Sequence, residues 1–302
     1  MPPPAAPDDR IAVAVTLRLV SAACMATMSA FIKLAEAGGA HLAEILFVRQ
    51  ALGIPLVGVV LALGPGLGTI RTQRFGAHVV RAAVGLASMV CLFTGVMLLP
   101  LAESTTLAFT VPIFATLLGA LVLKEPAGWH RWGAVLAGFA GVLIVAQPGS
   151  GHFPLSGAVA GIAAAFLTAV ASILLRQIGR TEHPFSTVFW FATLSTLPLS
   201  IAFALHHGSH PAVTWLWLIG VGLCGNAAQL AMTASLRRGS VSLVVPMDYS
   251  SLVWATLYGW MLFAVLPEPA TWLGAPLIVA SGSYIIWREH RLRRRETRRA
   301  VA

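Results

Sequence analysis

The chain has 302 residues, of which 57% are hydrophobic and only 10% are charged, and its mean hydropathy is +0.81. Charged residues make up about a quarter of an ordinary soluble domain, so this composition excludes that class. The net charge of +9 does not indicate a nucleic-acid surface, because seven of the twenty basic residues fall between Arg288 and Arg299 and most others occupy short gaps between apolar runs.

Ten apolar segments follow in chain order, each long enough to cross a hydrocarbon layer about 30 Å thick as a helix. They lack the strict alternation of a membrane β-barrel strand. The first begins near Ile11, after two aspartates and one arginine, and has no A-x-A cleavage site before a polar mature domain, so we predict a retained helix and not a signal peptide. The segments cover about residues 11–36, 42–63, 78–98, 102–123, 130–147, 154–176, 185–205, 213–236, 241–265 and 270–287.

Basic residues alternate between successive gaps. With the N-terminus placed inside, sixteen of the twenty lysines and arginines fall at cytoplasmic positions, and the external gaps contain none. This is the asymmetry of the positive-inside rule. We therefore predict that both termini are cytoplasmic. The remaining four basic residues lie within or at the ends of helices, and they are Arg18, Lys33, Arg49 and Arg81.

An internal repeat divides the chain. The string EPAGW at 125–129 recurs as EPATW at 268–272, and GAVLAGFAG at 133–141 recurs as GAPLIVASG at 274–282. Glu-Pro-Ala alone has a plainer explanation as a helix start, but two matching strings favour duplication. Because five is odd, a duplicated five-helix unit enters the membrane in the opposite orientation. The predicted regions are a cytoplasmic tail at 1–10, two five-helix repeats at 11–148 and 153–288, and a basic cytoplasmic tail at 289–302.

On these residues the chain resembles the drug/metabolite transporter superfamily, specifically its EamA-type ten-helix branch, from Val20 to Glu289. The resemblance is strongest over 100–149, which 246–289 echoes. It implies two inverted repeats and a central cavity lined mainly by helices 1, 3, 4, 6, 8 and 9. It also implies proton-coupled or exchange transport of solutes such as amino acids, vitamins or nucleotide-related metabolites. Where the family usually has Gly-Glu after the fourth helix, this chain has Lys124-Glu125.

Asp248 is the candidate proton-coupling residue. An ionisable side chain at mid-bilayer costs at least about 2.5 kcal/mol, so each one needs an explanation. Asp248 lies about eight residues into the ninth segment, beside Tyr249, Ser250 and Ser251. Two readings remain open: a titrating or cation-binding carboxylate that faces the cavity, and a carboxylate that pairs with a basic residue or caps backbone freed by Pro246.

For the other charged side chains in the membrane segments, a structural role is the favoured interpretation. Arg49 either pairs with an acid, the nearest in sequence being Glu44, or holds a substrate carboxylate. Lys33 and Arg18 lie close enough to helix ends to snorkel, and Arg81 lies near the cytoplasmic start of its helix. An acid in a first helical turn is stabilised by the helix dipole, so Glu103 is expected to cap the fourth helix.

Neutral polar and aromatic side chains in the apolar segments are candidates for the cavity lining. Asn226, Gln229 and Thr233 follow i, i+3, i+7 spacing and share one helical face. Such a stripe either binds a polar solute or holds helices together. The predicted substrate-binding set is Thr27, Phe109, Thr110, Thr168, Ser172, Asn226, Gln229, Thr233, Tyr249 and Trp254.

No metal, cofactor or catalytic residue is predicted. The three cysteines lie inside apolar runs without paired spacing. His206 and His210 have the i, i+4 spacing of a metal site, but Gly208 and Pro211 interrupt their gap, so we predict a solvated loop. Without a nucleophile and base at membrane depth, an intramembrane enzyme is only a remote alternative.

The sequence therefore predicts a secondary transporter of the bacterial inner (plasma) membrane. No GxxxxGK[ST] string is present, so energy must come from a gradient or from exchange. The expected solute is a small polar or amphipathic metabolite such as an amino acid. The alternative is import of a vitamin or nucleotide-related metabolite of the riboflavin or S-adenosylmethionine type. The expected partners are this solute and the lipid bilayer, without nucleic acid, for a monomer or homodimer.

Overall fold

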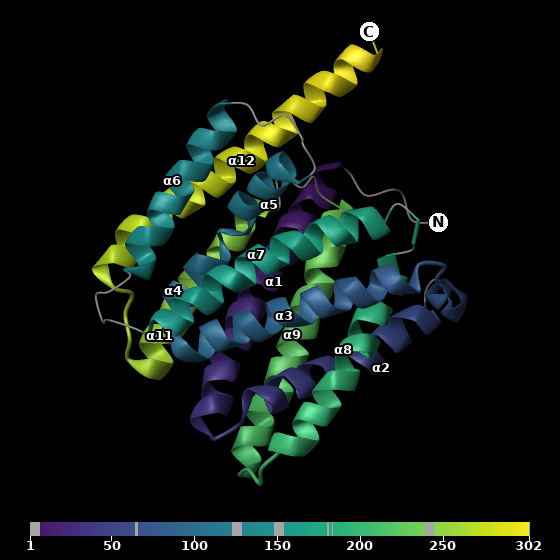
Figure 1. Ribbon diagram of the computed structural model, residues 1–302, viewed down its shortest axis with the longest axis vertical. Helices are drawn as coiled ribbons and strands as arrows, with labels where there is room; N and C mark the ends of the chain where they lie inside the picture. The colour runs from purple at the N-terminus through teal and green to yellow at the C-terminus, as the bar shows by residue number, and fades with distance from the viewer. Residues whose placement is uncertain are drawn as a thin grey trace.

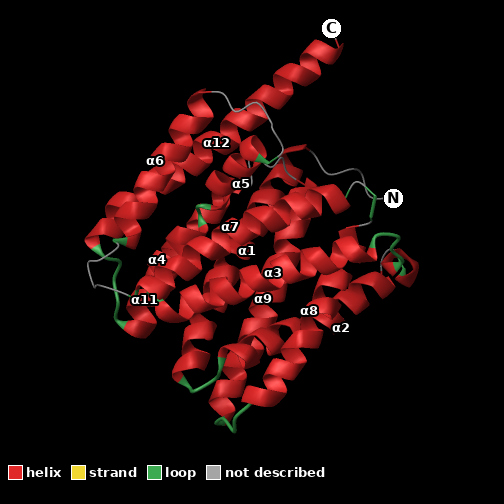
Figure 2. Cartoon of the chain, in the orientation of Figure 1, coloured by secondary structure: helices red, strands yellow, loops and turns green. Residues whose placement is uncertain are grey.

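The computed structural model describes residues 7–63, 66–122, 129–147, 154–179, 181–182, 184–238 and 245–301, and these contain helices and connecting turns but no strand (Figures 1 and 2). The first half comprises α1 (Pro7–Ala37), α2 (Leu42–Leu63), the 3-10 helix η1 (Leu67–Ile70), α3 (Phe75–Leu98), α4 (Leu101–Ala108), α5 (Val111–Leu121) and α6 (Trp129–Ala146). The second half comprises α7 (Leu155–Ile178), α8 (Pro184–His206), α9 (Ala212–Arg238), the 3-10 helix η2 (Val245–Tyr249), α11 (Ser250–Phe263) and α12 (Pro269–Val301).

Each of the ten predicted segments coincides with helical residues, so the all-helical fold is confirmed. Within the described ranges, eight helical stretches are long and apolar enough to cross a membrane, counting α4 and α5 as one. The other two segments correspond to a shorter apolar helix at Trp132–Ala146 and to η2 followed by the 14-residue α11.

The fourth predicted segment is broken at Phe109 and Thr110. Pro112 in the first turn of α5 has no backbone N–H, so the helical bond to the carbonyl four residues earlier is missing. The backbone nitrogens of Phe109 and Thr110 instead bond to the carbonyls three residues before them. The side-chain oxygen of Thr110 also donates to the carbonyl of Leu107 at 2.7 Å. The break places Phe109 in a turn in the middle of the span.

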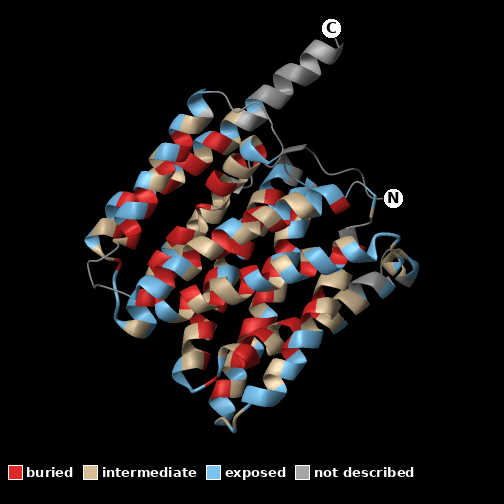
Figure 3. Cartoon of the chain, viewed as in Figure 1, coloured by how far each residue is buried: buried red, intermediate tan, exposed pale blue. Residues whose placement is uncertain are grey.

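Many large apolar side chains are exposed on the outside of the bundle, whereas several charged groups are buried within it. Figure 3 shows how buried and exposed residues alternate along the helices. Leu197, Leu223 and Leu273 are 60%, 61% and 73% exposed, whereas Glu44 and Glu103 are fully buried. A water-soluble domain shows the reverse distribution. The apolar surface is therefore suited to lipid, and the chain is a multi-pass membrane protein.

Helices pack in pairs that join the two halves. In the described ranges α1 lies along α9, α3 along α7, and α6 along α12, while α2 packs against α8 and α9. Small residues allow these close approaches. A Cβ atom added to Gly95 would lie 3.3 Å from the backbone nitrogen of Gly161, and one added to Gly274 would lie 2.7 Å from the carbonyl oxygen of Gly141.

We expect Gly274→Val to loosen the α6–α12 pair. Its new Cβ would also lie 2.6 Å from Val145, so one of the two helices has to move. Overpacking of this kind costs about 1–3 kcal/mol, and the melting temperature of the detergent-purified protein should fall. Gly133→Ala on α6 is the control, because a Cβ there meets nothing within 4 Å. Equal melting temperatures for the two variants would contradict the tight contact.

Candidate functional site

Arg18 of α1 and Asp248 of η2 form a bidentate ion pair. Nε of Arg18 donates to Oδ1 of Asp248 at 2.5 Å, and Nη2 donates to Oδ2. Arg18 is 5% exposed, whereas the Asp248 side chain is 37% exposed. The carboxylate is therefore the more accessible member of the pair, and the guanidinium is the buried one. The expectation that Arg18 snorkels is wrong, because a charged partner inside the bundle compensates for its burial.

Two further contacts involve the η2–α11 segment that carries Asp248. The hydroxyls of Thr27 and Tyr258 lie 2.9 Å apart between α1 and α11. The Phe109 ring meets the Tyr249 ring edge-on, with centroids 4.8 Å apart. We call this set the polar seam, and it consists of Arg18, Thr27, Phe109, Asp248, Tyr249 and Tyr258.

The polar seam includes four of the predicted site residues: Thr27, Phe109, Tyr249 and Asp248. Trp254 adjoins it, since its ring lies 6.2 Å from that of Tyr258 on the same helix. Sequence reasoning missed Tyr258, although its position four residues after Trp254 places both aromatic rings on one face of α11.

Of the remaining predicted residues, Thr110 follows Phe109 in the same turn, and the other five lie away from the polar seam. Thr168 bonds to Ser88 across α7 and α3 at 2.8 Å, and the exposed Ser172 donates to the carbonyl of Thr168. On α9, Asn226 lies against Gly53 of α2 and donates to the carbonyl of Gly222. Gln229 and Thr233 are exposed farther along α9, and Thr110 is buried. Their assignment to a substrate cavity stays a prediction.

Arg49 does not pair with Glu44. Its guanidinium lies 5.7 Å from the centre of the Phe93 ring, and Nη1 donates to the side-chain oxygen of Gln50 at 2.9 Å. Among the described residues no acid forms an ion pair with it, and its Nε lacks a hydrogen-bond partner. Arg81 lies over the Phe191 ring in the same way, at 4.6 Å. Both cations are therefore stabilised by aromatic faces.

Glu44 instead forms the first of two carboxylate–histidine pairs. Its side chain accepts hydrogen bonds from the backbone nitrogens of His41, at 2.6 Å, and Gly208, at 3.1 Å. Its Oε1 lies 2.8 Å from Nε2 of His210. The predicted solvated loop is therefore wrong for His210, because the buried carboxylate holds its ring. His206 is exposed and stacks on His41 with ring centroids 4.4 Å apart.

The second carboxylate–histidine pair joins His78 of α3 to Glu182, which precedes α8. Nε2 of His78 lies 3.8 Å from the Glu182 carboxylate, and both side chains are buried. The other carboxylate oxygen accepts a bond from the backbone nitrogen of Gln73 at 3.2 Å. In the described part of the chain, no three histidine, cysteine, aspartate or glutamate side chains are grouped to hold a metal ion.

Glu103 caps α12 and not its own helix. Its Oε1 accepts from the backbone nitrogen of Glu268 at 3.0 Å and from the hydroxyl of Thr271 at 2.9 Å. The expectation of a cap on the fourth helix is therefore wrong, because the carboxylate satisfies donors at the start of a different helix. On the same side of the bundle, Nζ of Lys33 donates to the carbonyl of Met97 at 3.2 Å.

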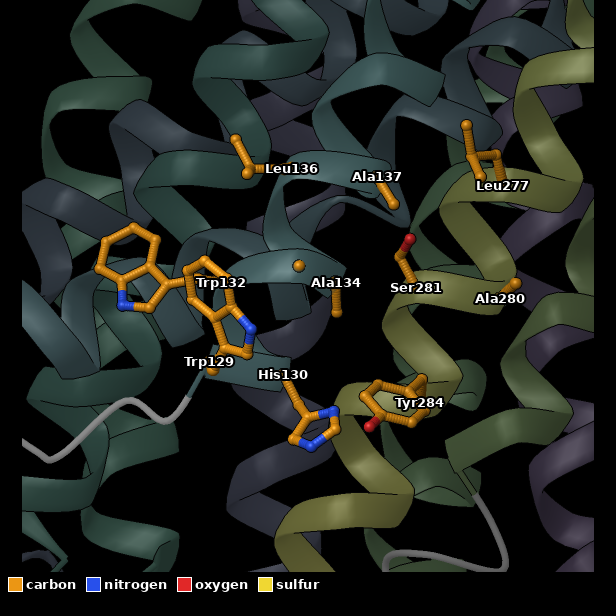
Figure 4. A pocket seen from close by; sticks show the side chains of 11 residues that line it. Trp129, His130, Trp132, Ala134, Leu136, Ala137, Leu277, Ala280, Ser281 and Tyr284 are labelled. Atoms are coloured by element: carbon orange, nitrogen blue, oxygen red, sulfur yellow. The ribbon is translucent and has the colours of Figure 1, made fainter.

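The structure also has a hollow of about 670 Å³ between α6 and α12 (Figure 4). It is mainly apolar and opens outward, and it includes none of the polar seam residues. The side chains that Figure 4 labels are Trp129, His130, Trp132, Ala134, Leu136, Ala137, Leu277, Ala280, Ser281 and Tyr284.

Comparison with known families gives matches in both halves. Residues 12–147 and 155–287 each match the model of the EamA-like transporter family. A solved crystal structure with 21% sequence identity covers 92% of this chain and 98% of its own, with a TM-score of 0.61. That likeness supports the fold.

Curated relatives cover most of the chain. A riboflavin transporter of Vibrio cholerae is 32% identical over 76% of this chain and 77% of its own length. A pseudopaline exporter of Pseudomonas aeruginosa is 28% identical over 90% and 95%. An S-adenosylmethionine uptake transporter of Rickettsia bellii is 24% identical over 74% and 77%. These names indicate membrane transport and not enzymatic catalysis.

Proposed function

Because the chain belongs to the EamA-like transporter family, we propose that it is a secondary transporter of a small polar or amphipathic metabolite. The solute moves by alternating access at the interface of two inverted five-helix repeats, in the bacterial inner membrane, with both termini in the cytoplasm. Proton coupling or exchange supplies the energy. The polar seam between α1, η2 and α11 is the proposed lining of the solute path.

The observation that carries this proposal is the exchange of packing partners between the halves. Each span of the first half has a counterpart five spans later, so α1 corresponds to α7, α2 to α8, α3 to α9 and α6 to α12. If each helix is replaced by its counterpart, the α1–α9 pair becomes α7–α3, and the α2–α9 pair becomes α8–α3. Both members of each exchange occur among the observed contacts. The α6–α12 and α2–α8 pairs map onto themselves. This exchange supports an approximate two-fold relation between the halves, which alternating access in inverted repeats requires.

The carboxylate–histidine pairs follow the same exchange. Glu44 lies at the start of α2 and joins the segment before α9, whereas Glu182 lies just before α8 and joins the start of α3. Successive spans cross in opposite directions, so α2 and α3 begin on opposite faces. Each face therefore has one carboxylate–histidine pair that connects the two halves. We propose that each pair closes its face in turn.

A second candidate is import of a vitamin or nucleotide-related metabolite. The aromatic rings of Phe109, Tyr249, Trp254 and Tyr258 favour it, because flat rings stack on planar heterocycles. Riboflavin and S-adenosylmethionine, named for two of the relatives, both contain such rings. The binding of an amino-acid-like solute would depend less on these aromatic rings.

A thermal-shift screen of the purified protein, followed by uptake into proteoliposomes, tests the proposed function. A ligand that binds the folded state raises the melting temperature, so riboflavin, S-adenosylmethionine and amino acids are compared in parallel. We expect a hit to be transported, and its uptake to respond to an imposed proton gradient or to internal unlabelled solute. Binding without uptake under either condition would contradict secondary transport.

Single cysteines test the orientation. In a variant without Cys24, Cys91 and Cys224, a cysteine at the exposed Ser209 position should react with an impermeant maleimide added outside, and one at the exposed Arg238 position should not. A cysteine at position 151, which lies outside the described residues, should react like the one at 209. The opposite labelling pattern would reverse the orientation.

A further inference from the structure

The hollow between α6 and α12 changes in character along its length. Figure 4 shows Leu136, Ala137 and Leu277 at one end, and His130 and Tyr284 at the other. The lining on α6 runs from residue 129 to 137, which is about 12 Å of helix. The hollow therefore runs along α6 for about 12 Å, from an apolar end to a polar end.

Basic side chains lie just beyond the polar end. Arg288 follows Tyr284 by one helical turn, and its Nη1 is buried without a hydrogen-bond partner. The guanidinium of Arg291 lies 5.3 Å from the centre of the Trp287 ring. An unpaired buried guanidinium nitrogen beside a second arginine favours an anionic group with several acceptor oxygens.

Two exposed tryptophans lie near the same end: Trp129 lines the hollow, and the Trp287 ring lies 6.0 Å from the ring of Tyr284. Trp129 is 87% exposed and Trp287 is 51% exposed. Tryptophan gathers where hydrocarbon meets the head groups of a bilayer, because its ring is amphipathic. The polar end of the hollow therefore lies at head-group depth, and its apolar end extends into the hydrocarbon.

We propose that this groove binds one anionic phospholipid of the leaflet at the α12 C-terminal end. One acyl chain lies against Leu136, Ala137 and Leu277, and the phosphate contacts Arg288 and Arg291. The apolar lining accepts any lipid chain, whereas the two arginines favour a net negative head group over a zwitterionic one. This site is separate from the polar seam and does not depend on the identity of the transported solute.

Native mass spectrometry of the purified full chain, with added phosphatidylglycerol or phosphatidylethanolamine, tests the proposal. Wild type should retain one phosphatidylglycerol molecule and bind phosphatidylethanolamine more weakly. Arg288→Gln/Arg291→Gln should weaken phosphatidylglycerol binding about tenfold or more, as expected for loss of charge-assisted hydrogen bonds. Arg298→Gln/Arg299→Gln removes the same charge from the same tail, farther along the sequence, and should bind as wild type does.

Leu136→Trp provides a second arm, because it fills the apolar part without changing any charge. It should displace the lipid even if the arginine variant does not fold. Equal weakening by both arginine pairs would show attraction by the tail as a whole and overturn the proposal. The proposal would also be overturned if Leu136→Trp bound phosphatidylglycerol as well as wild type does, or if wild type bound the two lipids equally.

Discussion

Replacing Asp248 with asparagine is expected to abolish gradient-driven transport while exchange of labelled solute persists. The carboxylate is the partly exposed member of the ion pair with Arg18, so it is the member that protons or solute can reach. Its loss also leaves the guanidinium of Arg18 buried without its partner. Breaking a fully buried pair costs about 3–5 kcal/mol. A smaller penalty is expected here, because the Asp248 side chain is 37% exposed, and the melting temperature should fall accordingly.

The double variant Arg18→Gln/Asp248→Asn separates the two effects. Removing both charges eliminates the unpaired guanidinium, so stability should recover while gradient-driven transport remains lost. Uptake and counterflow are measured in the same proteoliposomes, and melting in the same detergent. Recovery of gradient-driven uptake in the double variant would mean that the pair is structural and that coupling lies elsewhere.

Glu44→Ala is expected to destabilise the protein far more than Glu182→Ala. Glu44 is fully buried, and its removal leaves the backbone N–H groups of His41 and Gly208 and the ring of His210 without their acceptor. Each unsatisfied buried group costs about 1–3 kcal/mol. Glu182 is 3.8 Å from His78, beyond hydrogen-bond distance, and accepts one backbone bond at 3.2 Å.

The measurement is the melting temperature of each variant against wild type, with Glu44→Gln as an intermediate case. Glutamine keeps an acceptor oxygen for one backbone donor, so it should restore part of the loss. If Glu182→Ala lowered the melting temperature as much as Glu44→Ala, the additional hydrogen bonds of Glu44 would not contribute to the stability of the folded protein, and the prediction would be wrong.

The helices could be predicted because their signal is local. Long apolar runs separated by glycine, proline and basic residues located all ten segments. The break in the fourth segment also had a local signal, since Pro112 removes a backbone donor in mid-span. Hydropathy averages over a window, however, and does not register a single missing hydrogen bond, so the break was not predicted.

The partners of polar side chains could not be predicted in the same way. Arg18 and Asp248 are 230 positions apart, and Glu103 and Glu268 are 165 apart. Sequence indicates the depth of each group, but the rotation of its helix and the identity of its neighbour depend on packing. Local rules therefore assigned Glu103 to its own helix, Arg18 to the membrane surface and His210 to solvent. In each case a distant side chain or backbone group determines the outcome.

The attachment of Glu103 to the start of α12 has a mechanical consequence. α4 belongs to the first half of the chain and α12 to the second, so one carboxylate ties the two halves together near the end of α1, where Lys33 reaches Met97. Glu44 makes a second such tie to the segment before α9, close to where α1 ends and α2 begins. In the proposed transport cycle, that face is expected to open only if both of these contacts break, or if the helices that they join move together as one unit.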